Sequence, residues 1–262
     1  TPYTFCTDMW AEVEYELVAP TVTTGPATSV EATAATGNGN ITDNGGEDCD
    51  KRGFVFGISS HGDPGNTAPA ASGYAHYVEE TDGFGISAFT GALTSLEPYT
   101  PYYVRAYAHN TAGYSYGDEV SFTTLAAIPT VNTSPATGVG PIAAILNGIL
   151  AFDGGEACNV RFQYGETIAY GIDTEWQLDL ESVVAFEQAI PGLDPNKTYH
   201  FRAQARNSAG TVNGADRTFT TLVAIPTVTT GEATGRGAIA ATLNGTLDDD
   251  GGEVCECGFE WG

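Results

Sequence analysis

Alternating apolar and polar positions dominate two long stretches of the chain. The apolar face consists of Tyr102, Val104, Ala106 and Ala108 in the first stretch and of Tyr199, Phe201, Ala203 and Ala205 in the second. A period of two places successive side chains on opposite faces of a strand, so each stretch predicts a half-buried β-strand. The turn sequences NTAG and NSAG follow, and EVSFTTL and RTFTTL then predict one further strand each.

A repeat unites these strands with the rest of the chain. Three segments begin alike at Pro20 (PTVTTGPAT), Pro129 (PTVNTSPAT) and Pro226 (PTVTTGEAT), with starts 109 and 97 residues apart. In each segment an Asn follows the Pro by 18 residues, and a Cys follows that Asn by 11 residues. Such a period predicts one small domain per copy.

The predicted fold is all-β, with tandem antiparallel sandwiches. The 33 glycines and 13 prolines punctuate short strands, and about seven such strands per ~100 residues are typical of a β-sandwich. We expect complete domains over residues 19–126 and 127–223. Residues 224–262 match only the first three strands of a copy, and residues 1–18 contain a segment that resembles the last strand.

The motifs of the second half of the repeat carry a resemblance to a known family. A Leu-x-Pro-x-x-x-Tyr phrase precedes each long strand, the strand contains Arg-Ala-x-Ala-x-Asn, and Phe-Thr-Thr closes the copy. These features resemble the fibronectin type III domains of bacterial surface and secreted proteins. The resemblance implies that Tyr102 and Tyr199 are tyrosine-corner residues. It also implies spacer, stalk or adhesive modules without catalytic residues.

The partial third copy leads to a hypothesis about assembly. Val13, Tyr15 and Leu17 form the apolar face of the N-terminal strand segment, and Phe259 and Trp261 belong to the open third copy. We expect the N-terminal segment of one subunit to complete the third copy of the next by strand addition. A head-to-tail contact of this kind propagates into a homopolymeric filament. The alternative is a fragment of a tandem-repeat cell-surface adhesin or spacer array.

The net charge of the chain argues against some classes of binding partner. The chain has 33 acidic and 9 basic residues, a formal net charge of −24. It therefore lacks the basic stripe that a nucleic-acid-binding protein uses to neutralise phosphates. No apolar run approaches the ~20 residues that span a bilayer, so we expect no membrane insertion. An acidic, non-catalytic repeat chain suits a secreted or cell-surface location.

The five cysteines are an odd number for a secreted chain. Cys6 lies in the N-terminal segment, and Cys255 and Cys257 lie two residues apart in the third copy. A disulfide between Cys255 and Cys257 is strained in a strand, so an intersubunit bridge from Cys6 to either residue is one interpretation. Free buried thiols are the other.

Four sequons of the form Asn-x-Ser/Thr begin at Asn40, Asn132, Asn196 and Asn244, and covalent glycans at these positions suit an exposed fibre. Catalytic, cofactor-binding and metal-binding sites are not expected, because the histidines are scattered and the acidic turns lack spaced calcium ligands. Carbohydrate binding stays open through four tyrosines that can stack on sugars: Tyr74, Tyr77, Tyr114 and Tyr116.

Overall fold

The fold is described by a computed structural model of residues 16–262, and it confirms the all-β prediction. Antiparallel strands form nearly all of the regular structure, and a single 3-10 turn, η1 (Pro69–Ala71), is the helical element of these residues. No helix in the described part of the chain has the length and apolarity needed to cross a membrane. The chain divides into two compact units, Thr1–Leu125 and Ala126–Gly262, which are described separately.

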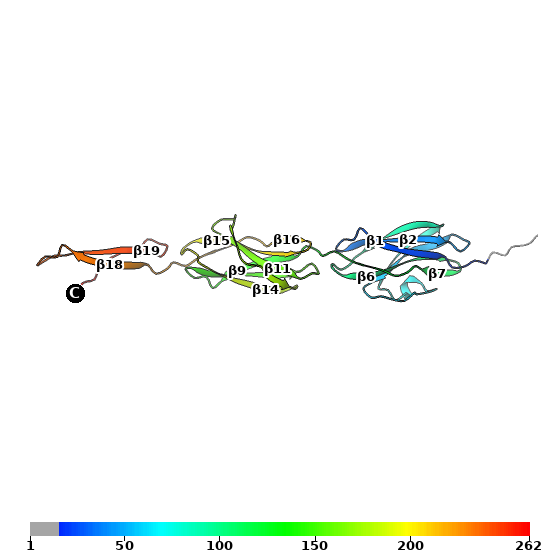
Figure 1. Cartoon of the computed structure of the whole chain (residues 1–262), viewed down its shortest axis with the longest axis horizontal. Coiled ribbons are helices and arrows are strands. Elements are labelled where there is room, and N and C mark those ends of the chain that lie inside the picture. The colour runs from blue at the N-terminus through cyan, green and yellow to red at the C-terminus, as the bar shows by residue number, and fades with distance from the viewer. Residues whose placement is uncertain (1–15) are drawn as a thin grey trace, which may run out of the picture. The chain divides into compact units, whose positions relative to one another are not determined.

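The first unit contains domain 1, a sandwich of a three-stranded and a five-stranded sheet (Figure 1). Its strands are β1 (Thr21–Thr28), β2 (Ala34–Asp43), β3 (Cys49–Gly57), β4 (His76–Phe84), β5 (Ser87–Thr94), β6 (Pro101–Asn110), β7 (Gly113–Tyr116) and β8 (Val120–Thr123). One sheet has the order β1-β2-β5. The other has the order β4-β3-β6-β7, with β8 also paired to β6.

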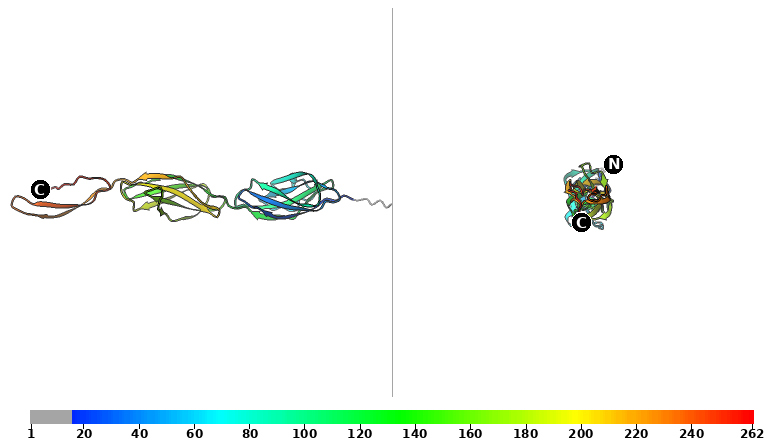
Figure 2. Two further views of the ribbon diagram at one scale, coloured as in Figure 1. Left: turned by 90° about the horizontal axis from the view of Figure 1, so that it is seen from above. Right: turned by 90° about the vertical axis from the view of Figure 1, so that its left-hand side faces the viewer.

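The second unit contains domain 2, which repeats this topology, and the third copy. The strands of domain 2 are β9 (Thr130–Thr137), β10 (Ala143–Phe152), β11 (Cys158–Gly165), β12 (Ile172–Asp173), β13 (Gln177–Leu180), β14 (Val184–Pro191), β15 (Thr198–Asn207), β16 (Gly210–Asn213) and β17 (Arg217–Thr220). The sheet β14-β10-β9 faces the sheet β12-β11-β15-β16, to which β13 and β17 also pair, so each domain has two layers (Figure 2).

Aromatic rings packed over glycines fill both cores. In domain 1 the ring of Phe54 occupies the space that a Cβ on Gly37 or Gly91 would need, at 2.9 and 2.7 Å. In domain 2 a Cβ on Gly148 would lie 2.6 Å from the ring of Phe186. The paired strands β10 and β14 place these two residues opposite each other. Because each ring occupies the space that a side chain at the glycine would need, these glycines are required by packing.

A long loop covers the outer face of the larger sheet in domain 1. The loop spans residues 58–75, and Tyr107 on β6 is fully buried beneath its neighbours on this face. Tyr116 donates its hydroxyl to the carbonyl of Thr67 at 2.7 Å, and Arg105 donates to the carbonyl of His61 at 3.2 Å. In domain 2 the connection from β11 to β13 (residues 166–176) is shorter, and different side chains cover the equivalent face of the sheet.

Candidate docking face of the third copy

A repeated asparagine joins the first two strands of every copy. Asn147 donates from Nδ2 to the carbonyl of Pro135 at 2.8 Å and to the hydroxyl of Thr137 at 3.1 Å. Asn38 and Asn244 make the equivalent pairs of bonds in the other two copies. The bonds span an irregularity in the strand pairing, which explains why this residue recurs in the repeat.

The third copy has its first two strands in the described residues, β18 (Thr227–Thr234) and β19 (Thr242–Asp249), which pair as a hairpin (Figure 1). The predicted third strand differs: residues 250–262 form a turn and then irregular backbone. In domain 2 the equivalent strand β11 bonds to β15, β12 and β13. Among residues 16–262 no strand pairs with residues 255–262, so the backbone of this segment joins no ladder there.

The apolar face of the third copy is open to solvent. Val228, Leu247 and Phe259 are 65%, 41% and 45% exposed. The residues at the equivalent positions of domain 2 are core residues: Val131 at 5%, Leu150 at 0% and Phe162 at 0%. A groove of about 380 Å³ runs between the β18–β19 hairpin and the segment that includes Phe259. Trp261 is also exposed. A contiguous exposed face of core-type residues makes this face a candidate interaction site.

Two sequence motifs form a clamp at one end of each complete domain. The first is the GGE turn (residues 44–48 and 153–157), and the second is the NxAG turn (residues 110–113 and 207–210). In domain 2 the carboxylate of Glu156 accepts bonds from the backbone N–H and the hydroxyl of Ser208, at 2.9 and 2.6 Å. Glu47 and Thr111 form the same pair in domain 1. The bonds from Ser208 lower the pKa of Glu156.

The asparagine of the NxAG turn holds the linker in place. Asn207 donates from Nδ2 to the carbonyls of Ala127 and Asp153, at 2.8 and 2.9 Å. Asn110 does the same to Val18 and Asn44 in domain 1. The approach is so close that a Cβ on Gly154 would lie 1.9 Å from the Ala127 oxygen, and the φ of +82° also favours glycine. We call this arrangement the turn clamp.

The third copy carries the acceptor half of the turn clamp. Ala224 donates its N–H to the carbonyl of Gly251 at 2.8 Å, as Ala127 does to Gly154. A Cβ on Gly251 would lie 2.0 Å from the Ala224 oxygen, which is the geometry of the complete domains. Glu253 occupies the position of Glu156. In the described residues no side chain donates to the carbonyls of Ala224 and Asp250 or to the carboxylate of Glu253, and the one asparagine amide at this turn, that of Asn196, donates to the carbonyl of Gly252 instead.

The N-terminal part of the docking prediction lies outside the described residues, which applies to Val13, Tyr15 and Cys6. Leu17 and Val18 are described, and their side chains are exposed. The N–H of Val18 donates to Gly45, as that of Ala224 does to Gly251.

This linker bond sets a register for comparing the sequences. Counting back five residues from Ala224 and from Val18 makes Val13 equivalent to Phe219, and Tyr15 is then equivalent to Thr221. Phe219 and Thr221 are both buried in domain 2. In this sequence register Val13 and Tyr15 match buried residues of the end of domain 2, whereas Leu17 matches the exposed Val223.

The described cysteines form no disulfide with one another. Cys49 and Cys158 are fully buried at equivalent core positions, and burial raises the pKa of each thiol to about 11. These two are inert small core residues. Cys257 is exposed and Cys255 is partly exposed. Cys257 is equivalent to Val160, a fully buried residue of domain 2, so completion of the third copy would bury its thiol.

The four sequons differ in the state of their amides. The amide of Asn244 is used by the strand-joining bonds, and that of Asn196 donates to the carbonyl of Gly252 at 2.8 Å. Asn40 is half-buried on β2. Asn132 is exposed on β9, and its side-chain amide makes no hydrogen bond within the described residues. Asn132 is thus the sequon asparagine whose amide is both exposed and free of a structural bond.

Two of the four tyrosines that could stack on sugars are held by contacts within domain 1, which corrects the prediction for Tyr74 and Tyr116. Tyr74 is buried and its hydroxyl bonds to Glu119, and Tyr116 is fixed by Thr67. Tyr77 remains exposed as a single ring. The tyrosine-corner positions show the expected contact: the hydroxyls of Tyr102 and Tyr199 accept the N–H of Glu97 and Asp194, at 2.9 and 3.0 Å.

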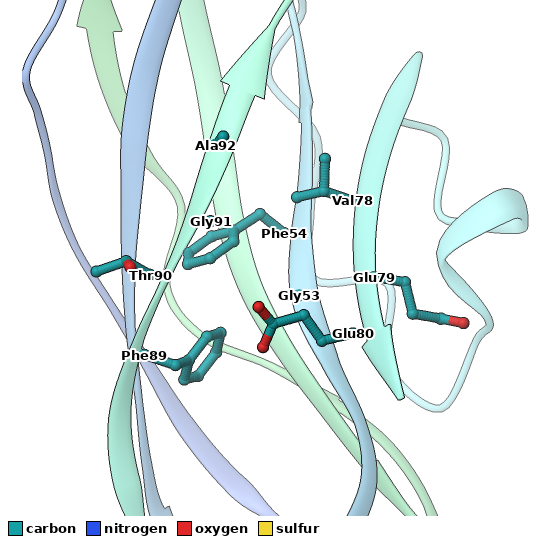
Figure 3. A pocket seen from close by; sticks show the side chains of 9 residues that line it. All are labelled: Gly53, Phe54, Val78, Glu79, Glu80, Phe89, Thr90, Gly91 and Ala92. Atoms are coloured by element: carbon teal, nitrogen blue, oxygen red, sulfur yellow. The ribbon is translucent and has the colours of Figure 1, made fainter. Parts of the chain in front are cut away.

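A pocket of about 250 Å³ opens between β4 and β5 of domain 1 (Figure 3). Phe54 and Phe89 form its floor, and Glu80 lies at its rim, where its carboxylate pairs with Arg52 at 2.8 Å. Glu79 points to the opposite side of β4 and pairs with Lys51 at 3.2 Å. Both carboxylates are paired with bases and directed to different faces, so they do not form a general acid and base couple.

Comparisons with known proteins add the following. No family model matches the chain, and no curated protein matches it. Among solved structures, the sensor domain of the anti-sigma factor RsgI4 in Pseudobacteroides cellulosolvens is similar over 36% of this chain and 94% of that chain, with 21% identity and a TM-score of 0.31. Chicken CNTN1 FN1-FN3 domains are similar over 88% of this chain and 85% of that chain, with 12% identity and a TM-score of 0.40.

Similarity at this level concerns the fold alone. The sheet orders and the two packed cores define the class: the chain contains tandem fibronectin type III-like β-sandwich repeats, followed by the β18–β19 hairpin that matches the start of a third copy. The turn clamp was not anticipated from the sequence. Its signal was nevertheless present, because the GGE and NxAG motifs occur together in both complete copies.

Proposed function

We propose that the chain is the structural subunit of an extracellular filament that assembles head to tail by β-strand complementation. In this proposal the N-terminal strand segment of one copy enters the open third copy of the next. The observation that carries the proposal is the exposure of Val228, Leu247 and Phe259, whose equivalents are buried in domain 2. At about 25 cal/mol per Å² of apolar surface removed from water, covering such a face is strongly favourable.

The character of the N-terminal segment supports the same contact. Val13 and Tyr15 stand at the positions of the buried residues Phe219 and Thr221, in the register set by the linker bond. A strand added to an open sandwich gains main-chain hydrogen bonds, and its alternate side chains fill the vacant core. Because the donor and the acceptor are at different places on the subunit, the contact is heterologous and repeats. The extracellular placement rests on the resemblance and on the acidic composition.

A second candidate has a specific observation in its favour. Ala224, Asp250 and Glu253 present the acceptors of a turn clamp, which in domain 2 receives the amide of Asn207 and the hydroxyl of Ser208. A hairpin with an Asn-Ser/Thr-Ala-Gly turn would supply those donors, and residues 1–18 contain no such turn. The chain would then be part of a tandem surface array whose third copy is completed by a hairpin of the repeat type.

Electron microscopy of the native, unreduced protein tests the filament, together with the reactivity of Cys255 and Cys257 toward a thiol reagent. We expect fibres whose two thiols are protected. The double variant Val13→Ser/Tyr15→Ser should stay dispersed and react fully, whereas Cys6→Ser should lose only covalent linkage between subunits. The control is Ile168→Ser, because Ile168 is an exposed apolar residue of domain 2.

Dispersed wild-type protein with reactive thiols would overturn the filament. In that case a synthetic peptide of residues 193–222, which contains the NxAG turn of domain 2, is added. Protection of Cys255 and Cys257 by this peptide, weakened by its Asn207→Ala form, would establish the second candidate. If no fibres form and the peptide does not protect the two thiols, both candidate functions are contradicted.

A further inference from the structure

The outer face of the larger sheet in domain 2 holds a ladder of guanidinium groups and aromatic rings. The guanidinium carbons of Arg206 and Arg161 lie 4.1 and 4.4 Å from the ring centre of Trp176. Arg202 lies 4.6 Å from the ring centre of Tyr170. Arg202 and Arg206 are both on β15, with the inward-facing Ala203 and Ala205 between them. We call this face the guanidinium ladder.

The arginines of the ladder are held in place mainly by hydrogen bonds to glutamine side chains, and less by ion pairs with acidic residues. The Nε of Arg202 donates to Gln163 at 2.9 Å, and that of Arg161 donates to Gln204 at 2.7 Å. Arg161 also pairs with Asp173 at 2.8 Å. Within the described residues neither Arg202 nor Arg206 has a carboxylate in salt-bridge distance. Two unpaired guanidinium groups are notable in a chain with 33 acidic and 9 basic residues.

The basic residues are also concentrated in this domain. Residues 127–223 contain 5 of the 9 bases and 10 of the 33 acids, a net charge of −5. The remaining residues contain 4 bases and 23 acids, a net charge of −19. The equivalent face of domain 1 has no free ladder, because Arg105 donates to backbone carbonyls of the covering loop and of Gly117. The ladder thus groups basic side chains on the surface of a chain that is otherwise acidic.

The spacing of the ladder identifies a partner. Arg202 and Arg206 are four residues apart on one strand, about 14 Å at 3.4 Å per residue. Glu12, Glu14 and Glu16 alternate with the apolar residues of the N-terminal segment, so an extended segment spaces Glu12 and Glu16 by the same ~14 Å. Their equivalents in domain 2 are Thr218, Thr220 and Leu222, which are exposed.

We propose that the guanidinium ladder of one copy binds the acidic face of residues 12–16 of a second copy and so joins filaments side by side. The inference rests on the proposed function, in which Val13 and Tyr15 enter a neighbour's third copy and the glutamates stay outside. Carboxylates accept paired bonds from guanidinium groups, which gives the contact direction as well as charge. This contact joins neighbouring filaments side by side, so it is different from the head-to-tail contact within one filament.

Two sets of variants separate the lateral contact from the joint. Filaments of Arg202→Gln/Arg206→Gln and of Glu12→Gln/Glu14→Gln/Glu16→Gln should form normally but remain single in electron micrographs and in low-speed sedimentation. Wild-type filaments should bundle. The matched control is Lys51→Gln/Arg52→Gln, which removes the same two charges from domain 1 and should bundle as wild type does. Bundling by the Arg202→Gln/Arg206→Gln filaments would overturn the inference.

If neither the wild type nor any variant forms filaments, the proposed function fails but the lateral contact is still untested. A peptide titration then tests the lateral contact by itself. The probe is a synthetic peptide of residues 11–18, titrated into the full chain by calorimetry. Its Kd should rise about tenfold with Arg202→Gln/Arg206→Gln, the sum of two or three exposed charge pairs. The Lys51→Gln/Arg52→Gln control should leave it unchanged. Equal binding to both variants, or undiminished binding of the triple-glutamine peptide, would contradict the ladder.

Discussion

At the scale of single residues, the repeat is maintained by side-chain amides that bond to backbone. Asn38, Asn147 and Asn244 join two strands, and Asn110 and Asn207 hold linkers to turns. The bonds of Asn110 and Asn207 are partly buried, and a carbonyl shielded from water without a donor costs free energy comparable to a lost hydrogen bond. Asparagine suits the task because its amide offers two donors from one nitrogen.

Asn207→Ala should lower the free energy of unfolding of domain 2 by about 1–3 kcal/mol, because the carbonyls of Ala127 and Asp153 lose their donor. Urea unfolding followed by circular dichroism measures the change. Asn132→Ala is the control, since that exposed side chain makes no hydrogen bond in the described residues, and it should stay within about 0.5 kcal/mol of wild type. Equal effects of the two variants would contradict the turn clamp.

At the scale of elements, a strand is only as ordered as its partners allow. The segment of residues 255–262 alternates like β11, which it matches in sequence, but β11 bonds to three strands and this segment bonds to none in the described residues. The alternation of β6 and β15 sufficed to predict their strands, because both lie between paired neighbours. Periodicity reports which face can be buried and not whether a partner is present.

The parts that sequence reasoning missed depend on contacts between distant residues. The covering loop of residues 58–75 buries Tyr74 through bonds to Glu119 and Arg105, which are more than 30 residues away in sequence. The turn clamp joins residues 80 positions apart in domain 2. Neither has a local pattern, although the paired motifs of the clamp repeat. The exposed face of the third copy was predicted because it needed only the alignment of the repeats.

Gly148→Ala tests the packing of aromatic rings over glycine. The new methyl group meets the ring of Phe186, so domain 2 should lose about 1–3 kcal/mol of its free energy of unfolding. In calorimetry one transition should move to lower temperature while that of domain 1 stays in place. Adding Phe186→Leu should recover part of the loss. The control is Gly140→Ala, where the nearest atom is 3.7 Å away; a comparable loss there would contradict the packing argument.

At the scale of the whole molecule, charge is distributed unevenly among the repeats. Residues 19–125 contain 12 acids and 3 bases, a net charge of −9, against −5 for residues 127–223. Like charges on one folded domain repel one another and so oppose folding. Salt weakens this repulsion, because at 0.1 M the Debye length is about 10 Å and charges farther apart than that are largely screened. The ion pairs of domain 1, such as Arg52 with Glu80, are exposed and offset little of it.

Added salt should therefore stabilise domain 1 more than domain 2. Raising sodium chloride from a low concentration to 0.5 M should increase the Tm of domain 1 by a few degrees more than that of domain 2, on the order expected for ~1 kcal/mol in a domain of this size. The Gly148→Ala variant assigns the two transitions in the calorimetric trace. A larger rise for domain 2 would show that screened attraction outweighs repulsion in this chain.

The turn clamp also decides how the chain responds to tension. A pull on the linker before domain 1 acts on Val18, whose N–H and carbonyl are both bonded to other parts of the domain. The load is thereby passed to Gly45 and Asn110, at the turns of both sheets, before it reaches the first residue of β1. We therefore expect these two bonds to break before the core of the domain and to re-form when the force is removed.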